Sequence, residues 1–242
     1  LIIIFNMQLP QAYTAVFEDA QIYNEKFTHL HFELKKPFSI KFRAGQFITF
    51  KINEQGSQRA YSICSDPDID HGVEILIDVS PQGEGIKYFQ NLKMGTEVFF
   101  TGPMGRFYIE DNAQEEAIVL MGTGSGVAPL YSMVIDQLKN KEDTRPITLY
   151  WGLRQASHLV WQDELARWSK NFPNFQFHPT LSQAETEWNL CRGRVTNCLQ
   201  VHDLPANAGY YLCGGKQMIN DVKQLLLARG VTADKIHHEK FF

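Results

Sequence analysis

The stretch MGTGSGVAPL, residues 121–130, holds three glycines within five residues, between an apolar run and a segment with helical periodicity. Glycine lacks the β-carbon that keeps ligands away from the backbone, and the first N–H groups of a helix bind phosphate. Pro129 suits the first turn of such a helix, because no N–H is needed there. The stretch predicts a phosphate-binding loop or, as the alternative, a tight strand-to-helix turn without a ligand. Its glycines do not follow the G-x-G-x-x-G order of dinucleotide-binding folds.

A second group of residues that could do chemistry is the tetrapeptide RAYS, residues 59–62. In an extended strand Arg59 and Tyr61 share one face and Ser62 takes the other. An arginine can pair with a phosphate, an aromatic ring can cover a flat ligand, and a hydroxyl can hydrogen-bond a ring atom. Taken alone, the tetrapeptide is a weak signal, and a surface arginine beside a core tyrosine is the commoner explanation.

The elements that would position RAYS are short strand-like segments separated by turn residues. They cover residues 12–23, 26–36, 45–52, 59–65, 73–80 and 96–102, with one short helix near residues 86–92. This pattern predicts a small antiparallel β-barrel in the first half of the chain.

The elements around the glycine loop alternate between strands and helices. Expected strands are residues 117–121, 147–152, 175–180, 209–214 and 235–242, and expected helices are 127–138, 159–172 and 216–229, with Gly230 as a C-terminal cap. Such alternation predicts a parallel sheet wrapped by helices, an α/β domain. The polar segment 110–116 separates the two patterns, so we expect two domains, residues 1–111 and 112–242.

Composition narrows the function classes. The net charge of −4 and the scattered basic residues argue against a nucleic-acid surface or a polybasic membrane patch. Four cysteines without iron–sulfur spacing favour a reducing cytoplasm. The apolar run LIIIF at the start is too short to span a bilayer. Met7 is a candidate for the natural start, with residues 1–6 as an extension, and a truncated anchor is the alternative.

Together these segments resemble the ferredoxin–NADP reductase superfamily, flavin-dependent reductases in which a barrel precedes a nucleotide-binding domain. The resemblance runs from about residue 12 to residue 241. The matching pieces, in the order of the family, are FRAGQF (42–47), RAYS (59–62), GEGIKYF (83–89), GPMGRF (102–107), GTGSGVAP (122–129), YWGLR (150–154), YLCGG (211–215) and HHEKF (237–241).

The resemblance implies that the barrel binds FAD. Arg59 would pair with the pyrophosphate, Tyr61 would lie against the isoalloxazine ring, and Ser62 would hydrogen-bond its reducible nitrogen. The start of the short helix would also hold the pyrophosphate, through Gly83, Gly85, Ile86 and Lys87. Because the family usually has Ser or Thr where this chain has Ile86, we expect FAD to be bound less tightly, with FMN as the alternative flavin.

The resemblance also implies that the second domain receives NADH or NADPH. The residues expected at that nucleotide are Gly122, Thr123, Gly124, Gly126, Pro129, Arg154, Ser182 and Gly214. Gln183 follows Ser182 where NADP-preferring relatives often have arginine, which favours NADH. Arg154, Arg192 and Arg194 could still pair with a 2′-phosphate, so use of both nucleotides stays open.

The catalytic residues that the resemblance implies are Ser62, Cys213, Glu239 and Phe241. Cys213 would lie beside the nicotinamide, Glu239 would approach Ser62, and Phe241 or Phe242 would cover the flavin until the nicotinamide enters. Ordinary packing is the alternative for Cys213 and Phe241, and a solvated chain end is the alternative for Glu239. Cys64, Cys191 and Cys198 are expected to be structural, and no metal site is expected.

The implied function is electron transfer from NAD(P)H through bound FAD to a separate protein acceptor, such as a ferredoxin, a flavodoxin or an oxygenase component. One alternative is an NAD(P)H-dependent reductase of free flavin or of a small oxidant. Another is a non-catalytic electron-transfer or regulatory subunit of a complex. The sequence does not favour any one acceptor.

Overall fold

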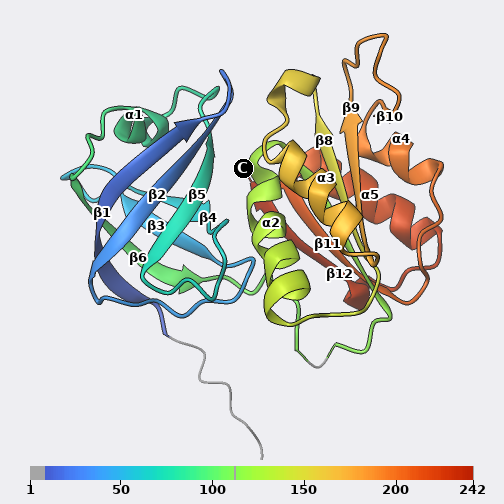
Figure 1. The fold of residues 1–242 in the computed structure, drawn as a ribbon, viewed down its shortest axis with the longest axis horizontal. Coiled ribbons are helices and arrows are strands. Elements are labelled where there is room, and N and C mark those ends of the chain that lie inside the picture. The colour runs from blue at the N-terminus through green and yellow to red at the C-terminus, as the bar shows by residue number, and fades with distance from the viewer. Residues whose placement is uncertain (1–8, 112, 242) are drawn as a thin grey trace, which may run out of the picture.

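The computed structural model describes residues 9–111 and 113–241 and contains two six-stranded sheets, one in each half of the chain (Figure 1). The first sheet is antiparallel, with the strand order β4-β3-β6-β1-β2-β5. Its strands are β1 (Gln11–Ile22), β2 (Phe27–Lys36), β3 (Phe47–Lys51), β4 (Gln58–Ser62), β5 (Gly72–Asp78) and β6 (Glu97–Met104). A bridge between Ile63 and Ile75 joins the two ends of this order, so the sheet curls into a nearly closed barrel.

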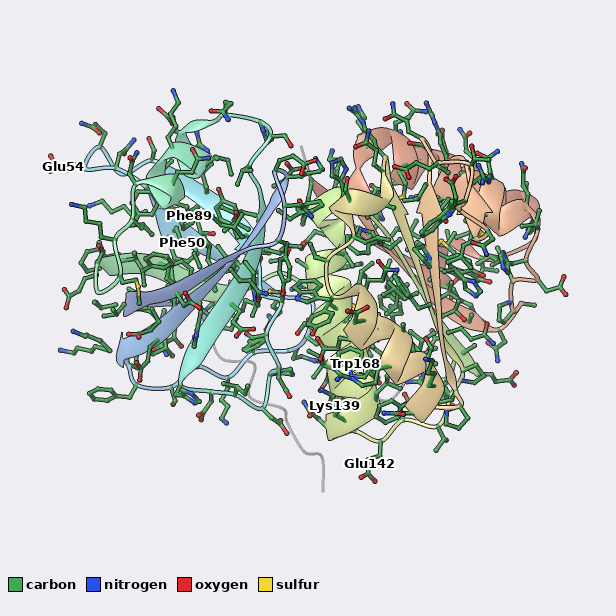
Figure 2. The ribbon with its side chains drawn as sticks, turned by 45° about the horizontal axis from the view of Figure 1, so that its top comes forward. Phe50, Glu54, Phe89, Lys139, Glu142 and Trp168 are labelled. Carbon is green, nitrogen blue, oxygen red and sulfur yellow. A yellow bond between two sulfur atoms is a disulfide. The ribbon has the colours of Figure 1, made fainter. Side chains whose placement is uncertain are left out.

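The barrel core follows from side-chain alternation along the strands. In β2, Leu30, Phe32 and Leu34 are buried, because every second side chain of a strand points to the same face. Phe50 meets Phe89 edge to face, with ring centroids 5.2 Å apart (Figure 2). Phe89 belongs to the helix α1 (Glu84–Gln90), so this contact fixes α1 against the barrel.

The second sheet is parallel, with the order β10-β9-β8-β7-β11-β12. Its strands are β7 (Ala117–Thr123), β8 (Ile147–Leu153), β9 (Phe175–Leu181), β10 (Cys191–Arg192), β11 (Ala208–Gly215) and β12 (Ile236–Phe241). Its helices are α2 (Val127–Ile135), α3 (Gln162–Asn171), α4 (Val195–Gln200) and α5 (Lys216–Ala228). Figure 1 shows α2 and α3 on one face of this sheet and α4 and α5 on the other. Covered on both faces, β7 is buried along almost its whole length, as its continuous apolar sequence predicts.

This architecture confirms the predicted fold class, an antiparallel β-barrel followed by an α/β parallel-sheet domain. The barrel strands end at Met104 and the parallel strands begin at Ala117, on either side of the predicted domain boundary. The strand β10 and the helix α4 are additions to the predicted elements. Residues 1–8, with the expected start at Met7, and Phe242 lie outside the described residues.

The two halves are joined by polar and aromatic contacts. Ser132 in α2 donates a hydrogen bond to the carbonyl of Ser65, at 2.7 Å. Trp161, just before α3, meets His29 of β2 edge to face at 5.6 Å between ring centroids. Within the second half, the Lys139 ammonium, just after α2, lies 4.5 Å from the ring centroid of Trp168 in α3 (Figure 2). Within the described chain, no helix is long and apolar enough to cross a bilayer.

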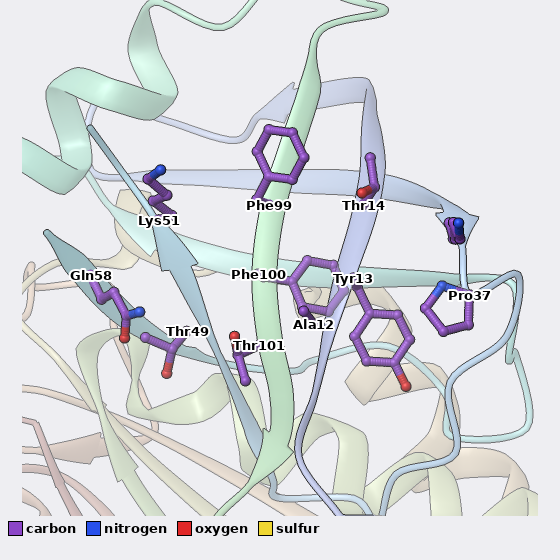
Figure 3. Close-up of a pocket in the computed structure, with 11 residues that line it drawn as sticks. Ala12, Tyr13, Thr14, Pro37, Thr49, Lys51, Gln58, Phe99, Phe100 and Thr101 are labelled. Atoms are coloured by element: carbon purple, nitrogen blue, oxygen red, sulfur yellow. The ribbon is translucent and has the colours of Figure 1, made fainter. Parts of the chain in front are cut away.

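The outer face of the barrel carries a pocket of about 630 Å³ over β1, β3 and β6 (Figure 3). The exposed ring of Phe99 belongs to its lining, and so do Lys36 and Lys51. Its described lining contains none of the predicted site residues, so the chemistry expected from the sequence belongs elsewhere.

Candidate active site

Arg59 and Tyr61 of β4 face the first turn of α1. A β-carbon on Gly85 would lie 2.4 Å from the Tyr61 hydroxyl and 3.1 Å from Arg59 Cγ, so only glycine lets the helix approach these side chains so closely. Burial raises the pKa of the Tyr61 phenol to about 12, against a smaller opposing effect of Arg59, so the hydroxyl stays neutral. The ring of Tyr61 is held edge to face by Phe89, at 5.0 Å between centroids.

The guanidinium of Arg59 is half exposed and donates to the Glu84 carboxylate at 2.9 Å. Beside this ion pair, nothing lies within 4 Å of the position a β-carbon on Gly83 would take. An exposed arginine next to an open helix start is a donor set for an anion, with Glu84 as its present acceptor.

The four residues predicted at the start of α1 have different roles in the structure. Gly83 and Gly85 give the open space and the close approach described above. Ile86 is buried in the barrel core, which an apolar side chain suits. The Lys87 N–H donates to the Gly83 carbonyl at 3.0 Å, so this amide closes the helix turn and does not serve an anion.

Ser62 and Glu239 meet across the boundary between the two halves. The Ser62 hydroxyl, which is buried, donates to a Glu239 carboxylate oxygen at 3.0 Å. Burial raises the pKa of the Glu239 carboxyl from 4.5 to about 7, and the Ser62 hydrogen bond only partly offsets that rise. At neutral pH Glu239 therefore exists in both protonation states and can hold or release a proton beside Ser62.

Cys213 lies next to Glu239 in the parallel sheet. It pairs with Glu239 of β12 on one side and with Gly122 of β7 on the other. The thiol is fully buried, and burial, with a smaller contribution from the nearby Glu239 charge, raises its pKa well above the ordinary value. Cys213 is thus a neutral, packed thiol in this structure, and Phe241 packs against the same core cluster.

The glycines of the 121–130 loop serve two purposes. A β-carbon on Gly126 would lie 2.3 Å from the Cys213 carbonyl oxygen, so this glycine allows the loop to pack on β11. Gly124 has φ +57° and open space beside it, which makes it the exposed part of the loop. Gly214, at φ +146°, leaves room for the Thr123 hydroxyl, which would be 2.3 Å from a β-carbon there. Trp151 fixes the loop by donating from its indole to the Gly124 carbonyl at 2.9 Å.

Next to this loop is a pocket of about 520 Å³ at the carboxyl edge of the parallel sheet, where ligands bind in α/β folds. Four predicted nucleotide residues line it: Thr123, Gly124, Arg154 and Ser182. Gly122, Gly126 and Pro129 are buried in the packing behind the loop, and Gly214 backs Thr123. Four of the eight residues predicted for the nucleotide thus line this pocket, and three others pack behind the loop.

The rest of the lining comes from segments that the sequence analysis did not place there. These residues are Lys26 and Ser80 of the barrel, Gly152 and Leu153 of β8, Gly193, Arg194, Val195 and Thr196 around the start of α4, and Gln217, Met218 and Asp221 of α5. Arg194 lies 3.9 Å from the Asp221 carboxylate. Arg192 is different, because its guanidinium donates to the carbonyls of residues 185, 186 and 188 and so folds the preceding loop.

These residues fit the two groups that the sequence predicts. The Arg59 guanidinium, the open first turn at Gly83 and Gly85, the neutral Tyr61 ring and the Ser62 hydroxyl provide a donor set and a flat surface for FAD. The pocket beside Thr123 lies within the volume range of about 300–1,000 Å³ that is usual for ligand sites, and Arg154 and Arg194 supply positive charge for a nucleotide. Ser62 of the barrel and Glu239 of the parallel sheet are hydrogen-bonded to each other, and Cys213 pairs with Glu239.

Two family models match the chain. The oxidoreductase FAD-binding domain matches residues 14–109, and the oxidoreductase NAD-binding domain matches residues 120–224. The first corresponds to the barrel and the second to the parallel-sheet half. Together they cover most of the chain.

Curated relatives are longer proteins. Over 218 residues the chain is 30% identical to a subunit of the Na(+)-translocating NADH-quinone reductase of Neisseria gonorrhoeae, covering 83% of this chain and 53% of that protein. It is also 30% identical over 218 residues to the reductase component of phenol 2-monooxygenase from Pseudomonas sp. strain CF600, covering 88% of this chain and 61% of that protein. The chain therefore spans only about half to three-fifths of the length of these relatives.

Solved structures share the fold. A cytochrome P450 reductase from Amycolatopsis has a TM-score of 0.87 and 26% identity, with 96% of this chain and 70% of that chain covered. A ferredoxin NADP+ reductase from Neisseria gonorrhoeae, solved with bound FAD and NADP, has a TM-score of 0.80 and 20% identity, with 96% and 99% covered. The second likeness concerns the fold alone.

Proposed function

Because this chain belongs to the ferredoxin–NADP reductase superfamily of flavin-dependent oxidoreductases, we propose that it passes electrons from NAD(P)H through bound FAD to a separate protein acceptor. The observation that carries this proposal is the hydrogen bond between Ser62 of the barrel and Glu239 of the parallel sheet, at 3.0 Å. It joins the half matched by the FAD-binding model to the half matched by the NAD-binding model beside Cys213.

In the proposed barrel site, Arg59 pairs with the pyrophosphate of FAD in place of Glu84, and the Gly83–Gly85 turn allows that anion close to the backbone. Tyr61 lies against the isoalloxazine ring, and Ser62 hydrogen-bonds its reducible nitrogen. When bound, FAD supplies the ability to take two electrons from a nicotinamide and to give them up singly or in a pair.

Glu239 has the proton-handling role in this proposal. Its carboxyl has a pKa of about 7 and accepts the Ser62 hydrogen bond, so it can keep the Ser62 hydroxyl oriented and take up or release a proton there. Phe241, two residues further along β12, covers the flavin face until the nicotinamide enters. Cys213 would lie beside the nicotinamide ring, as a packed neutral thiol.

The nicotinamide nucleotide occupies the pocket beside Thr123 and Gly124, with Arg154, Ser182 and Arg194 near its phosphates and ribose. We propose NADH as the preferred nucleotide. Gln183 cannot pair a 2′-phosphate as a guanidinium would, and the Asp221 carboxylate in the pocket lining disfavours a further negative charge.

A test of this preference is Gln183→Arg. The added guanidinium should raise kcat/KM for NADPH relative to NADH by about tenfold, the effect of one charge-assisted hydrogen bond. Gln176→Arg, an exposed position on β9, adds the same charge elsewhere and should leave the ratio unchanged. An unchanged ratio in Gln183→Arg would show that this position does not contact the ribose end of the nucleotide.

The acceptor is proposed to be a separate redox protein. A reductase component of an oxygenase is among the relatives, and the described cysteines are either disulfide-bonded or buried thiols.

The experiment is gel filtration of FAD-loaded protein, followed by an assay of NADH-dependent reduction of ferricyanide. Retained FAD with ferricyanide reduction is expected. Complete loss of flavin on the column would favour a reductase of free flavin, and retained FAD without reduction would favour a non-catalytic subunit.

A further inference from the structure

Cys191 and Cys198 form a disulfide at the rim of the nucleotide pocket. Cys191 lies in the edge strand β10 and Cys198 in α4, so the bond ties the edge of the sheet to the helix beside it. Residues 193–196, which lie between the two cysteines, line the pocket next to Thr123. The bond therefore closes a small ring of chain whose inner residues contribute part of the pocket surface.

Besides the disulfide, this ring is held by packing of Val195 and Cys198 in the buried cluster of the parallel-sheet half and by local hydrogen bonds. β10 pairs with β9 over two residues, and the Gly193 N–H donates to the Leu181 carbonyl at 2.8 Å. At the start of α4, the Arg194 N–H donates to the Asn197 side chain at 2.8 Å. A disulfide between residues seven positions apart constrains the unfolded chain less than one that closes a longer loop. In the folded protein it also restricts the geometry of residues 193–196, which lie inside the ring.

We propose that Cys191 and Cys198 are a reversible dithiol–disulfide pair that controls the affinity of the nucleotide pocket, an inference that rests on the nucleotide binding proposed above. The sulfur atoms of two free thiols must stay at van der Waals distance from each other, whereas a disulfide holds them at bonding distance. Reduction therefore lets β10 and α4 move apart and shifts Arg194 and Thr196 away from Thr123 on the opposite wall. The oxidised form binds nicotinamide nucleotide tightly, and the reduced form binds it weakly.

The surroundings of the two sulfurs differ in a way that suits thiol–disulfide exchange. Cys191 is partly exposed, whereas Cys198 is buried. The His202 imidazole lies 3.7 Å from Cys198 Sγ, and its Nδ1–H donates to the Cys198 carbonyl at 2.8 Å. The accessible sulfur of Cys191 is thus the one that an incoming thiolate attacks, and Cys198 Sγ is the leaving sulfur.

The reductant is a dithiol, such as a thioredoxin-class protein or dithiothreitol. One of its thiolates attacks Cys191 Sγ, the bond between the two cysteines breaks, and Cys198 leaves as a thiolate that takes up a proton. The second thiolate of the reductant then attacks the mixed disulfide at its own first sulfur and releases Cys191, which is also protonated. Two electrons and two protons pass to the protein, and the reductant becomes a disulfide.

Binding and reduction must be coupled reciprocally. If reduction weakens nucleotide binding by a given factor, bound nucleotide protects the disulfide by the same factor. We expect a factor of about five or more, within the usual range of coupling between sites. A fivefold effect corresponds to a shift of about 20 mV in the thiol–disulfide midpoint of this two-electron couple.

The experiment measures NAD+ binding to FAD-loaded protein by calorimetry, before and after treatment with dithiothreitol. The wild type should lose affinity about fivefold on reduction. The double variant C191S/C198S should show the weaker affinity with and without reductant, and C64S, which changes a buried thiol outside the ring, should behave as the wild type. Titration in a dithiothreitol redox buffer should show the midpoint shift when NAD+ is present.

Alkylation in denaturant counts the thiols: two in the oxidised protein and four in the reduced one. Four free thiols after equilibration with oxidised glutathione would overturn the proposal, because the pair would not form. Equal NAD+ affinity in both redox states would overturn it as well, while leaving the proposed function intact. NAD+ binding in neither state would contradict the pocket itself, and with it the proposed function.

Discussion

In the proposed flavin site, Glu84 competes with the FAD pyrophosphate for the Arg59 guanidinium. The Glu84 carboxylate accepts a hydrogen bond from the guanidinium that is proposed to pair with the pyrophosphate. Both side chains are well exposed, so the pair is weak and water can replace either partner. Binding of FAD must break this pair and bring a phosphate charge close to a carboxylate.

Replacing Glu84 by glutamine should therefore tighten FAD binding. The expected decrease in Kd is about threefold, the effect of one exposed ion pair, measured by quenching of FAD fluorescence on binding. Glu33→Gln removes an exposed carboxylate from β2 and should leave the Kd unchanged. A weaker or unchanged affinity in Glu84→Gln would mean that Arg59 does not receive the pyrophosphate.

The ionisation of Glu239 makes the stability of the protein depend on pH. Its pKa is about 7 in the folded protein, against 4.5 for the free side chain. Below pH 4.5 the carboxyl is protonated in both folded and unfolded protein, so its protonated form then contributes fully to stability. As pH rises from 4.5 to 7 the unfolded chain ionises first, and that contribution is lost.

Glu239→Gln keeps a neutral side chain at every pH and should thus stabilise the protein relative to the wild type at higher pH. The difference in the free energy of unfolding should be near zero at pH 4, grow up to pH 7 and level off at about 2 kcal/mol, allowing for partial exposure. Urea unfolding of both proteins from pH 4 to pH 8 measures it. A difference that stays constant over this range would contradict the raised pKa.

The sequence was informative about those residues of the candidate site whose own side chains make the contacts. Ser62 and Glu239 form a hydrogen bond, and Thr123 and Arg154 line one pocket. The sequence was less informative where backbone packing requires a residue, because a glycine that avoids a clash looks the same in sequence as one that admits a ligand. Gly126 is such a case, pressed against the Cys213 carbonyl. Trp151, which holds the loop, carries no sequence signal that separates it from a core residue.

At the scale of elements, the loop at residues 121–126 couples β7 to β11. Gly126→Ala would place a β-carbon 2.3 Å from a backbone oxygen that has no freedom to move without its strand. Gly124→Ala meets nothing within 4 Å and is strained only through its φ of +57°. The two substitutions therefore separate steric overlap from backbone strain within one loop.

We expect Gly126→Ala to lower the free energy of unfolding by about 3 kcal/mol and Gly124→Ala by about 1 kcal/mol. Urea unfolding measures both. Equal effects would mean that the loop relaxes freely, and the close packing of the loop on β11 would then not be what fixes Thr123.

The elements that the sequence predicted are those with a clear period. The alternation in β2, the continuous apolar run of β7 and the helical spacing of α5 were each sufficient to predict the element. The strand β10 and the helix α4 are too short to establish a period, and the loop before them is folded by Arg192 donating to backbone carbonyls. This is also why the sequence did not reveal that residues 193–196 line the pocket.

For the whole molecule, the account depends on how two independently recognisable halves meet. The barrel brings Arg59, Tyr61 and Ser62 to its edge, and the parallel sheet brings Thr123, Cys213 and Glu239 to its own. The Ser62–Glu239 hydrogen bond and the Ser132–Ser65 hydrogen bond both cross the boundary. Neither half alone contains the complete set of groups.

The most direct test is anaerobic mixing of FAD-loaded protein with NADH, followed by the absorbance of the bound flavin in a single turnover. The account predicts that NADH bleaches this absorbance, and that Ser62→Ala slows the bleaching roughly a hundredfold, as misplacement of reacting groups does. Ser169→Ala, on α3, should match the wild type. If FAD and NADH both bind and the flavin absorbance stays unchanged, the two halves do not bring their ligands together, and the central claim is wrong.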